Sequence, residues 1–548
     1  MTKYLRSRPM WLTGFAVIAV AVFYAPGFGG FWHGDDLSNL HRVYMLSQQG
    51  TLWTDTFRLF AEPVPSGGAF YRPMMMLSLA LNYAFADAHY GGWYLVNLVV
   101  HLSNTMLVSL IVRRLATRYG CDAMFAAPLA ALLFGLCPSI AEGVYWVSAR
   151  SDGWVTLLSL AGVYCWVGAA ASTSSRSAFA LPLLLILALG FKESAAVLPL
   201  QMTLLAVAWR GPVTRAQRWA MIAAFLGGIL FLVWRAFLFG NAWQVYAPGN
   251  HESVALHFKL VSALLSFGPW WAALTSATPF LAIVYVGCCA VGAVGVVLLA
   301  FRRPSPQWHL ALALTAASGG LALATLLNLG AMSSTGEGGR LSYGPVAWLT
   351  LAIGVLLSRP HTLPNTSSRE PFATSAAAIA FTLAVVAGSG VLCGHLHAAS
   401  AAQASMRTLT QSIPRWAASH PGLTMLLVPD HEGAIVMARN AQGSMVLAPI
   451  QQEPYLHRVL PTLSSEIHLR QEQFSRGLVR RLAFIRPRLA DTATLAAIQE
   501  PAEAGWPQHL ACWSKSQQKI VSIQSPPTDA TSEHWLASIR GTIDNCER

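Results

Sequence analysis

Long apolar stretches alternate with short polar segments over the first 395 residues of the chain. Eleven of these stretches approach the roughly 20 residues that a helix needs to cross a bilayer. They are 10–28, 94–112, 123–139, 153–171, 177–191, 194–209, 218–239, 280–301, 308–330, 343–358 and 373–394. The pattern predicts a mainly α, polytopic bundle of about eleven transmembrane helices, in which 177–191 and 194–209 are the shortest.

Positive charge orients this bundle and decides the role of a twelfth apolar stretch, 258–276. The N-terminal segment MTKYLRSR carries three basic residues, and cytoplasmic segments of membrane proteins collect Lys and Arg. Alternation from a cytoplasmic N-terminus puts Arg302 and Arg303 on the cytoplasmic side only if 258–276 does not cross. We therefore expect eleven spans, an outer C-terminus, and a stretch 258–276 that lies on the outer surface or re-enters.

Residues 396–548 are more polar and form a second predicted domain, after a transmembrane domain of residues 1–395 with a first outer loop at 29–93. Strand-like runs broken by Gly and Asn occupy 423–450, and two later segments are polar enough for surface helices, 464–480 and 533–541. We expect a small extracytoplasmic α/β domain. Its Cys512 and Cys546 could form a disulfide in an oxidising periplasm or stay as two buried thiols, and spacing alone does not decide.

Composition agrees with a membrane protein. Hydrophobic residues make up 54% of the chain and charged residues 11%, against about 25% charged in ordinary globular proteins. The mean hydropathy is +0.47 and the formal net charge is +12. We assign the excess positive charge to cytoplasmic loops, expect no nucleic-acid partner, and interpret the first apolar stretch as an uncleaved signal anchor because no small-residue cleavage site follows it.

Charged side chains gather at the predicted outer ends of the spans. Each alone could be a solvated loop charge or an interfacial anchor, but charges beside hydrocarbon usually face a cavity or one another. The set consists of Asp35, Asp36, Arg72, Glu142, Arg150, Asp152, Lys192, Glu193, Arg235, Glu337 and Arg340. Its concentration on one predicted face favours a functional site.

The residue types in this set suit a lipid-linked anionic substrate. A carboxylate can act as a general base, and Arg and Lys can hold a phosphate. A prenyl chain belongs in the lipid, with its phosphate head group where these residues are expected. The site therefore indicates an enzyme or a transporter for a lipid-linked anion at the outer leaflet, and a non-catalytic membrane anchor for the outer tail is a third hypothesis.

The order of the motifs resembles the GT-C superfamily of integral-membrane glycosyltransferases, in particular the transmembrane protein O-mannosyltransferases with C-terminal tetratricopeptide repeats. The resemblance covers residues from about 30 to 350 and consists of five elements. They are the acidic pair Asp35–Asp36; Tyr71, Arg72, Pro73, Asn82, Asn97 and His101; Pro138, Glu142 and Val144 followed by Arg150, Ser151 and Asp152; Lys192–Glu193; and Arg340, Tyr343 and Pro345.

Three features depart from the family pattern. Gly339 stands where the family has the Glu of its late Glu–Arg pair, although Glu337 is close by. Cys137 stands where the family often has His, and the tail shows no tetratricopeptide pattern. The acceptor of that family therefore cannot be carried over.

The resemblance implies sugar transfer with inversion from a polyprenyl-phosphate-linked donor to a protein, glycan or lipid acceptor. It implies that Asp35 takes the acceptor proton, with Asp36 as the second candidate base or an orienting group. Arg72, Arg150, Lys192 and Arg340 are the expected ligands of the donor phosphate. Supporting roles toward these cations, the sugar or the acceptor fall to Glu142, Asp152, Glu193, Arg235 and Tyr343.

The sequence also bears on metal dependence, on transport as a competing function and on the location of the protein. We expect no resident metal, and the alternative is a divalent cation on Asp35, Asp36 and Glu142. A transporter or flippase of a lipid-linked precursor is the competing hypothesis, although no inverted repeat is visible. The expected location is a bacterial inner membrane, with the tail in the periplasm.

Overall fold

The computed structural model describes residues 2–32, 35–62, 70–169, 175–240, 279–302, 306–329, 339–360, 370–419, 424–427, 509–514 and 517–523. The chain forms two compact units. Unit 1 consists of Met1–Phe28, Trp53–Ala80 and Tyr94–Leu396, and unit 2 of Gly29–Leu52, Leu81–Trp93 and His397–Arg548.

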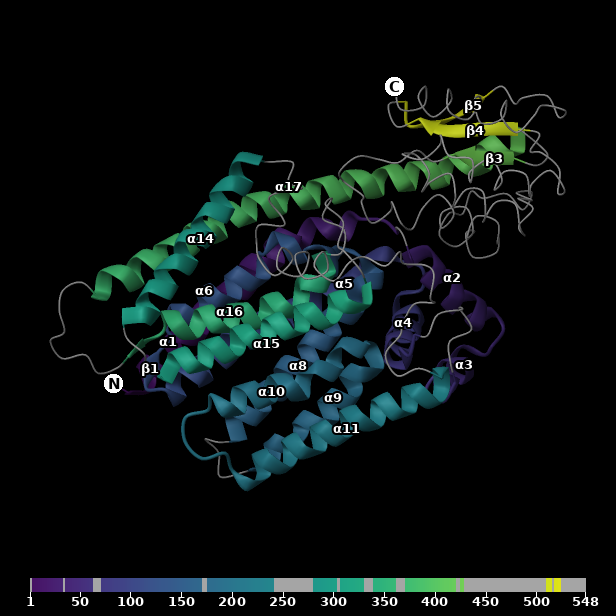
Figure 1. Ribbon diagram of the computed structural model, residues 1–548. Helices are drawn as coiled ribbons and strands as arrows, with labels where there is room; N and C mark the ends of the chain where they lie inside the picture. The colour runs from purple at the N-terminus through teal and green to yellow at the C-terminus, as the bar shows by residue number, and fades with distance from the viewer. Residues whose placement is uncertain are drawn as a thin grey trace, which may run out of the picture. The chain divides into compact units, whose positions relative to one another are not determined.

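The described part of the chain is mainly helical (Figure 1). The first helices are α1 (Thr2–Tyr24), η1 (Ala25–Gly29), α2 (Asp35–Gln48), α3 (Leu52–Arg58), α4 (Pro73–Ala86) and α5 (Tyr90–Arg118). The middle of the chain contains α6 (Ala126–Gly135), η2 (Pro138–Ile140), α7 (Glu142–Tyr145), η3 (Val147–Ala149), α8 (Arg150–Ala169), η4 (Ser175–Phe179), α9 (Ala180–Phe191), η5 (Glu193–Val197), α10 (Leu198–Val207) and α11 (Arg215–Phe239). Then follow α14 (Pro279–Arg302), α15 (Pro306–Leu329), η6 (Gly339–Ser342), α16 (Tyr343–Leu357) and α17 (Glu370–Ser419).

The chain is a multi-pass membrane protein. Among the described residues, six helices are long and apolar enough to cross a bilayer: Met10–Gly29, Tyr90–Arg118, Arg215–Phe239, Pro279–Leu298, Gly339–Leu357 and Ser375–Ala401. A seventh span would be the pair Ala126–Gly135 and Pro138–Tyr145, which is bent by 46°. The other predicted spans form the helices α8, α9, α10 and α15, which do not meet this test, so the count of eleven stays a prediction.

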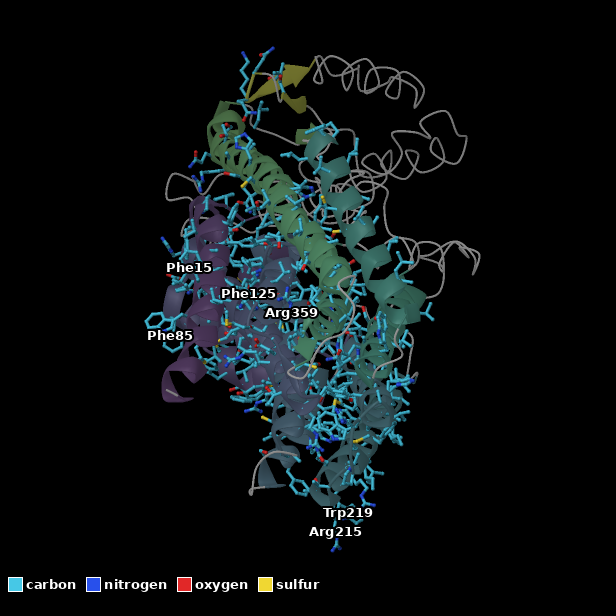
Figure 2. All side chains as sticks on the ribbon, turned by 90° about the vertical axis from the view of Figure 1, so that its left-hand side faces the viewer. Phe15, Phe85, Phe125, Arg215, Trp219 and Arg359 are labelled. Atoms are coloured by element: carbon cyan, nitrogen blue, oxygen red, sulfur yellow. The ribbon has the colours of Figure 1, made fainter. Side chains whose placement is uncertain are left out.

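The outer surface of unit 1 carries large apolar side chains, as lipid contact requires. Phe15 of α1, Phe125 before α6 and Trp219 of α11 are exposed (Figure 2). In a soluble protein such exposure would be unusual in extent, whereas a bilayer is an apolar solvent for it. These side chains are therefore consistent with the spans predicted from the sequence.

Small residues bring the helices of unit 1 close together. A side-chain carbon at Gly135 of α6 would come within 2.5 Å of Val20 of α1 and within 3.0 Å of Thr105 of α5. One at Gly354 of α16 would come within 2.7 Å of Val112 of α5. Membrane helices associate largely through such close packing, because lipid offers no hydrophobic driving force between them.

Two short helices of unit 1 are separated by a single extended residue. Lys192 has φ −162° and ψ 143° and lies between α9 and η5. The predicted spans 177–191 and 194–209 are helical over Ser177–Phe191 and Glu193–Val207, separated at Lys192, and their crossing of the bilayer stays a prediction. The break brings two charged side chains into an otherwise apolar region.

Unit 2 contains the acidic pair at the start of α2, the end of α4, the start of α5 and the C-terminal part of α17. It also contains a three-stranded sheet, in which β3 (Thr424–Leu427) is parallel to β4 (His509–Ser514), and β4 is antiparallel to β5 (Lys519–Ile523). Thr424 pairs with His509 and Leu510 with Ile523. A second, two-stranded sheet joins β1 (Cys121–Asp122) to β2 (Arg359–Pro360) in unit 1.

Much of the predicted tail domain falls outside the described residues. This holds for the segments 464–480 and 533–541, for the stretch 258–276 and for Cys546, and the side chain of Cys512 is likewise not described. The predicted domain boundary at 395/396 also stays a prediction, and it falls inside the continuous helix α17, which extends well beyond the predicted span 373–394.

Candidate active site

The break between α9 and η5 places Lys192 against α8. The Lys192 ammonium lies 2.6 Å from Oδ1 of Asp152, and each side chain is only 10% exposed. Burial lowers the pKa of Lys192, and the neighbouring Asp152 carboxylate opposes that shift. Lys192 and Asp152 therefore form an internal ion pair. The sequence predicts them as two separate polar residues, and the packing of α8 on α9 brings them together.

The neighbouring carboxylate, Glu193, faces two arginines. Nη2 of Arg72, the residue before α4, lies 3.3 Å from its Oε2. Burial alone would raise the pKa of Glu193. The positive charges of Arg72, Arg235 and Lys192 lower it by more than that, so the pKa lies below its ordinary value. Glu193 is therefore held as a carboxylate, and Arg235, which is 1% exposed, faces it from α11.

The carboxylate of Glu142 binds both the guanidinium and the backbone N–H of Arg340. Oε1 of Glu142 accepts from Nη1 of Arg340 at 2.5 Å, and Oε2 accepts from the backbone N–H of Arg340 at 2.9 Å. The guanidinium also lies 4.4 Å from the ring centre of Trp146, a cation–π geometry. Two contacts therefore orient the guanidinium, and a third holds the backbone of Arg340.

The neighbouring Gly339 is required by the same packing. A side-chain carbon at this position would collide with the carbonyl oxygen of Ser139. The family residue at this position, Glu, could not be accommodated here without a backbone shift. In the described residues the carboxylate beside Arg340 comes instead from Glu142, while Glu337 lies outside them.

Arg150 begins α8 and is 1% exposed. Its Nε donates to the carbonyl of Val147 at 3.2 Å, and its Nη1 donates to the hydroxyl of Ser78 at 3.1 Å. These hydrogen bonds orient the guanidinium from two elements, η3, which contains Val147, and α4, which contains Ser78.

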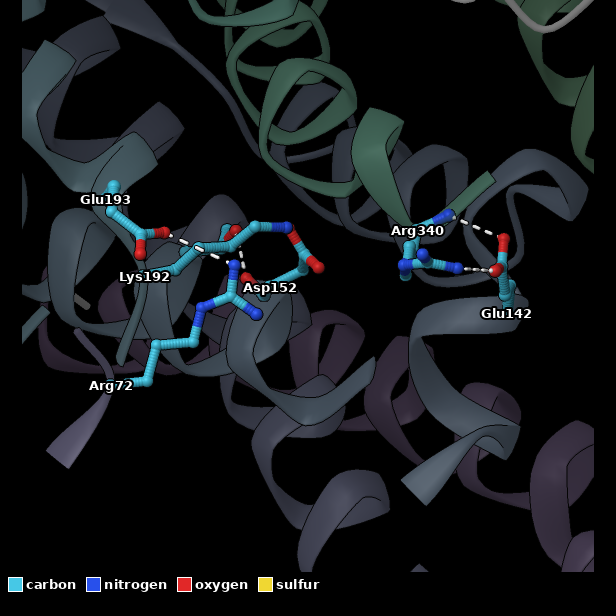
Figure 3. A network of polar contacts seen from close by, with 7 residues as sticks. Arg72, Glu142, Asp152, Lys192, Glu193 and Arg340 are labelled. Carbon is cyan, nitrogen blue, oxygen red and sulfur yellow. Dashed lines mark hydrogen bonds and ion pairs between the residues drawn. The ribbon is translucent and has the colours of Figure 1, made fainter. Parts of the chain in front are cut away.

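Figure 3 shows the six residues of the three ion pairs. Together with Arg150 and Arg235 they are here called the cation cluster. It contains five cations, Arg72, Arg150, Lys192, Arg235 and Arg340, and three carboxylates, Glu142, Asp152 and Glu193. Arg72 and Arg340 each act electrostatically on Lys192, so the pairs influence one another. Within unit 1 the cation cluster thus has two positive charges in excess.

A buried polar layer formed by Asn97, His101 and Asn104 of α5 with Tyr343 supports this cluster, and a role is predicted from the sequence only for Tyr343. His101 and Asn104 of α5 both contact the hydroxyl of Tyr343, at 2.7 Å and 3.4 Å. Asn97, one turn earlier, donates to the carbonyls of Val144 and Trp146 at 3.2 Å and 3.0 Å. Positions 97, 101 and 104 lie on one face of a helix, a spacing that could have indicated this layer.

Tyr343 was predicted to support sugar or acceptor. The structure shows it 1% exposed, with its hydroxyl bound inside the polar layer. Its ring contacts the position of Gly143, next to Glu142. Its structural contribution is therefore to the backbone that presents Glu142 and Arg340.

The acidic pair begins α2 in unit 2. Asp36 is 1% exposed, and the side chain of Asp35 lies outside the described residues. No group of three or more His, Cys, Asp or Glu side chains within the described ranges is arranged to hold a metal ion. Because the side chain of Asp35 is not described, the metal alternative on Asp35, Asp36 and Glu142 stays untested.

Comparison with known proteins gave two structural likenesses. No family model matches the chain, and no curated protein matches it. The crystal structure of ArnT from Cupriavidus metallidurans bound to undecaprenyl phosphate is 12% identical, with a TM-score of 0.41, over 78% of this chain and 84% of that one. The cryo-EM structure of the arabinofuranosyltransferase AftD from Mycobacteria is 16% identical, with a TM-score of 0.38, over 76% of this chain and 29% of that one.

Proposed function

We propose that this protein is a GT-C type membrane glycosyltransferase that transfers a sugar from a polyprenyl-phosphate-linked donor to a protein, glycan or lipid acceptor. The observation that carries the proposal is the cation cluster, in which five cations and three carboxylates lie within a bundle of apolar helices. Charges are retained in such surroundings chiefly where they serve a function. We place the reaction at the periplasmic face of a bacterial inner membrane, with the N-terminus in the cytoplasm and the tail in the periplasm.

The excess charge of the cluster suits the leaving group of this reaction. When the bond between the anomeric carbon and the phosphate oxygen breaks, negative charge grows on the phosphate. Cations already held by carboxylates and carbonyls stabilise that charge without having to reorganise. Arg72, Arg150, Lys192 and Arg340 are the proposed phosphate ligands, and Arg235, Glu142, Asp152 and Glu193 orient them or bind sugar hydroxyls.

The acceptor hydroxyl attacks the anomeric carbon from the face opposite the phosphate, which inverts the configuration. Its proton passes to a carboxylate of the acidic pair, with Asp35 as the base and Asp36 as the orienting group. The products are the glycosylated acceptor and polyprenyl phosphate. No strong general acid is needed, because a phosphate is already a good leaving group.

A transporter or flippase for the same lipid-linked sugar is the second candidate. The observations that favour it are the break at Lys192 and the 46° bend between Ala126–Gly135 and Pro138–Tyr145. Interrupted helices line the substrate sites of many transporters. The position of Arg235 argues against a transporter, because transporter sites lie near the midplane of the bilayer. Arg235 lies in the last two turns of α11 and not at its middle.

The deciding experiment measures transfer from radiolabelled polyprenyl-phosphate sugars in membranes that contain the wild-type, Asp35→Asn or Asp36→Asn protein. Loss of the base should lower turnover by about 10²–10⁴-fold. Arg58→Ala is the matched control, because Arg58 is exposed and its ion pair among the described residues is a local one with Asp55. The size of the labelled product separates protein from glycan or lipid acceptors. Labelled donor that crosses the bilayer without forming product would establish the transporter instead.

A further inference from the structure

We propose that Gln403 and Arg407 of α17 are positioning residues, which clamp the segment leading into the acidic pair. The inference rests on the proposed function, because it assigns these residues a role through Asp35 and Asp36. The two side chains are four positions apart on a helix and therefore lie on the same face. All the residues concerned belong to unit 2.

Arg407 holds two successive backbone carbonyls. Its Nη2 donates to the carbonyl of Gly29 at 3.0 Å and to that of Gly30 at 2.8 Å. Its guanidinium carbon also lies 5.4 Å from the ring centre of Phe31. Hydrogen bonds from a charged donor are stronger than those between neutral groups, so this contact is a firm anchor for residues 29–31.

Gln403 holds the next residue and links it to α5. Its side-chain oxygen accepts from the backbone N–H of Phe31 at 3.3 Å, and its side-chain nitrogen donates to the hydroxyl of Tyr90 at 3.2 Å. Gln403 is 5% exposed. A buried side chain whose two polar atoms both bind in this way fixes the relative positions of the segments it joins.

Aromatic side chains pack against the same segment. Trp32 is 1% exposed and makes edge contacts with the rings of Tyr90 and Trp93, at 5.4 Å and 5.2 Å. Trp93 is itself fixed, because its ring N–H donates to the carbonyl of Asp87 at 2.7 Å. Phe31 is thus held by a backbone hydrogen bond and Trp32 by packing.

The clamp ends close to the acidic pair along the chain. Trp32 and Asp35 are separated by two residues, so an extended chain can place their Cα atoms no more than about 11 Å apart. On the other side of the pair, Leu40 and Val43 of α2 are fully buried. The position of the pair therefore depends on anchors on both sides, and one of them is supplied by α17.

The consequence is a specific effect on catalysis. A general base must lie within hydrogen-bond reach of the proton that it takes, and a displacement of about 1 Å can cost about 100-fold in rate. Loosening the clamp should therefore lower kcat. Donor affinity should not change, because the proposed phosphate ligands belong to the cation cluster of unit 1.

The test compares Gln403→Met, Arg407→Gln and Arg407→Lys in the full-length protein, with kcat and donor Kd measured separately. We expect kcat to fall about 10- to 100-fold for Gln403→Met and Arg407→Gln, with partial rescue in Arg407→Lys and wild-type donor Kd in all three. Thr408→Val is the matched control, since within the described part of the chain the Thr408 hydroxyl bonds to the carbonyl of Ala404 in its own helix. Its kcat should equal the wild-type value.

Two further readouts distinguish positioning from general damage. In an Asp35→Asn background, Arg407→Gln should cause no additional loss of activity, because the base through which Arg407 acts is gone. Hydrogen exchange of the Phe31 amide should accelerate in Gln403→Met, which cannot accept that hydrogen bond, and stay at the wild-type rate in Thr408→Val.

The inference is overturned by a wild-type kcat in Gln403→Met and Arg407→Gln, by equal losses in kcat and donor affinity, or by additive loss with Asp35→Asn. A wild-type protein that transfers no sugar from any donor would instead overturn the proposed function. Phe31 exchange would then still show whether the clamp itself exists, because that measurement requires no catalysis.

Discussion

The hydroxyl of Tyr343 lies 2.7 Å from Nδ1 of His101, and Nε2 of the same imidazole lies 3.0 Å from the carbonyl oxygen of Gly135. A carbonyl can only accept, so Nε2 carries the proton, Nδ1 accepts, and the hydroxyl of Tyr343 donates. Tyr343 follows η6, which contains Arg340. The tautomer of one histidine is thus linked to the backbone that presents a proposed phosphate ligand.

Tyr343→Phe should destabilise the protein, because it leaves Nδ1 of His101 buried without its donor. The expected cost is about 1–3 kcal/mol, seen as a lower midpoint of thermal unfolding in detergent. Thr382→Val is the control, because the exposed Thr382 hydroxyl, as far as the structure describes its neighbours, bonds to the carbonyl of Ala378 in the same helix. An unfolding midpoint in Tyr343→Phe equal to that of the control would contradict the assigned hydrogen bond.

Gly339→Ala should disturb the site through the main chain. The added carbon collides with the carbonyl of Ser139, so η6 must shift and the backbone N–H of Arg340 must move from Glu142. We expect weaker donor binding, measured by titration with polyprenyl phosphate. Gly320→Ala is the matched control, because a side-chain carbon there meets nothing within 4 Å. Wild-type affinity in Gly339→Ala would show that the packing is tolerant.

Asp152→Asn should cost about 3–5 kcal/mol of stability, because it leaves the buried Lys192 ammonium without its counter-charge. The double variant Asp152→Leu/Lys192→Met removes both charges and should recover most of that loss. Donor binding should stay impaired in the double variant, because the proposed phosphate ligand is absent. Equal recovery of stability and of donor affinity would remove Lys192 from the donor site.

Glu193 predicts a pH dependence of stability. Its folded pKa lies below the ordinary value of 4.5, so its ionised form contributes stability above that pH, and the contribution disappears as the pH falls through the folded pKa. The difference in unfolding midpoint between the wild type and Glu193→Gln should therefore be largest near neutral pH and shrink below about 4.5. A difference that does not change between pH 7 and pH 3 would contradict the shift.

The sequence by itself determined that this is a multi-pass membrane protein and which charged residues are candidates for its site. A run of about 20 apolar residues has few stable alternatives to a membrane helix, and charges that gather at the ends of several such runs are costly enough to be informative as a set. These are local properties, so the break at Lys192–Glu193 and the helix α11 could be predicted without knowledge of the packing.

Only the tertiary structure decided which distant residues contact one another. Glu142 and Arg340 are 198 positions apart, and Phe31 and Gln403 are 372 apart. No local pattern encodes such pairs, because they depend on which helix faces pack together and on small residues such as Gly339 that permit close approach. The buried role of Tyr343 and the continuation of α17 to Ser419 became visible for the same reason. Both depend on contacts between distant segments, whereas hydropathy reports the surroundings of one segment at a time.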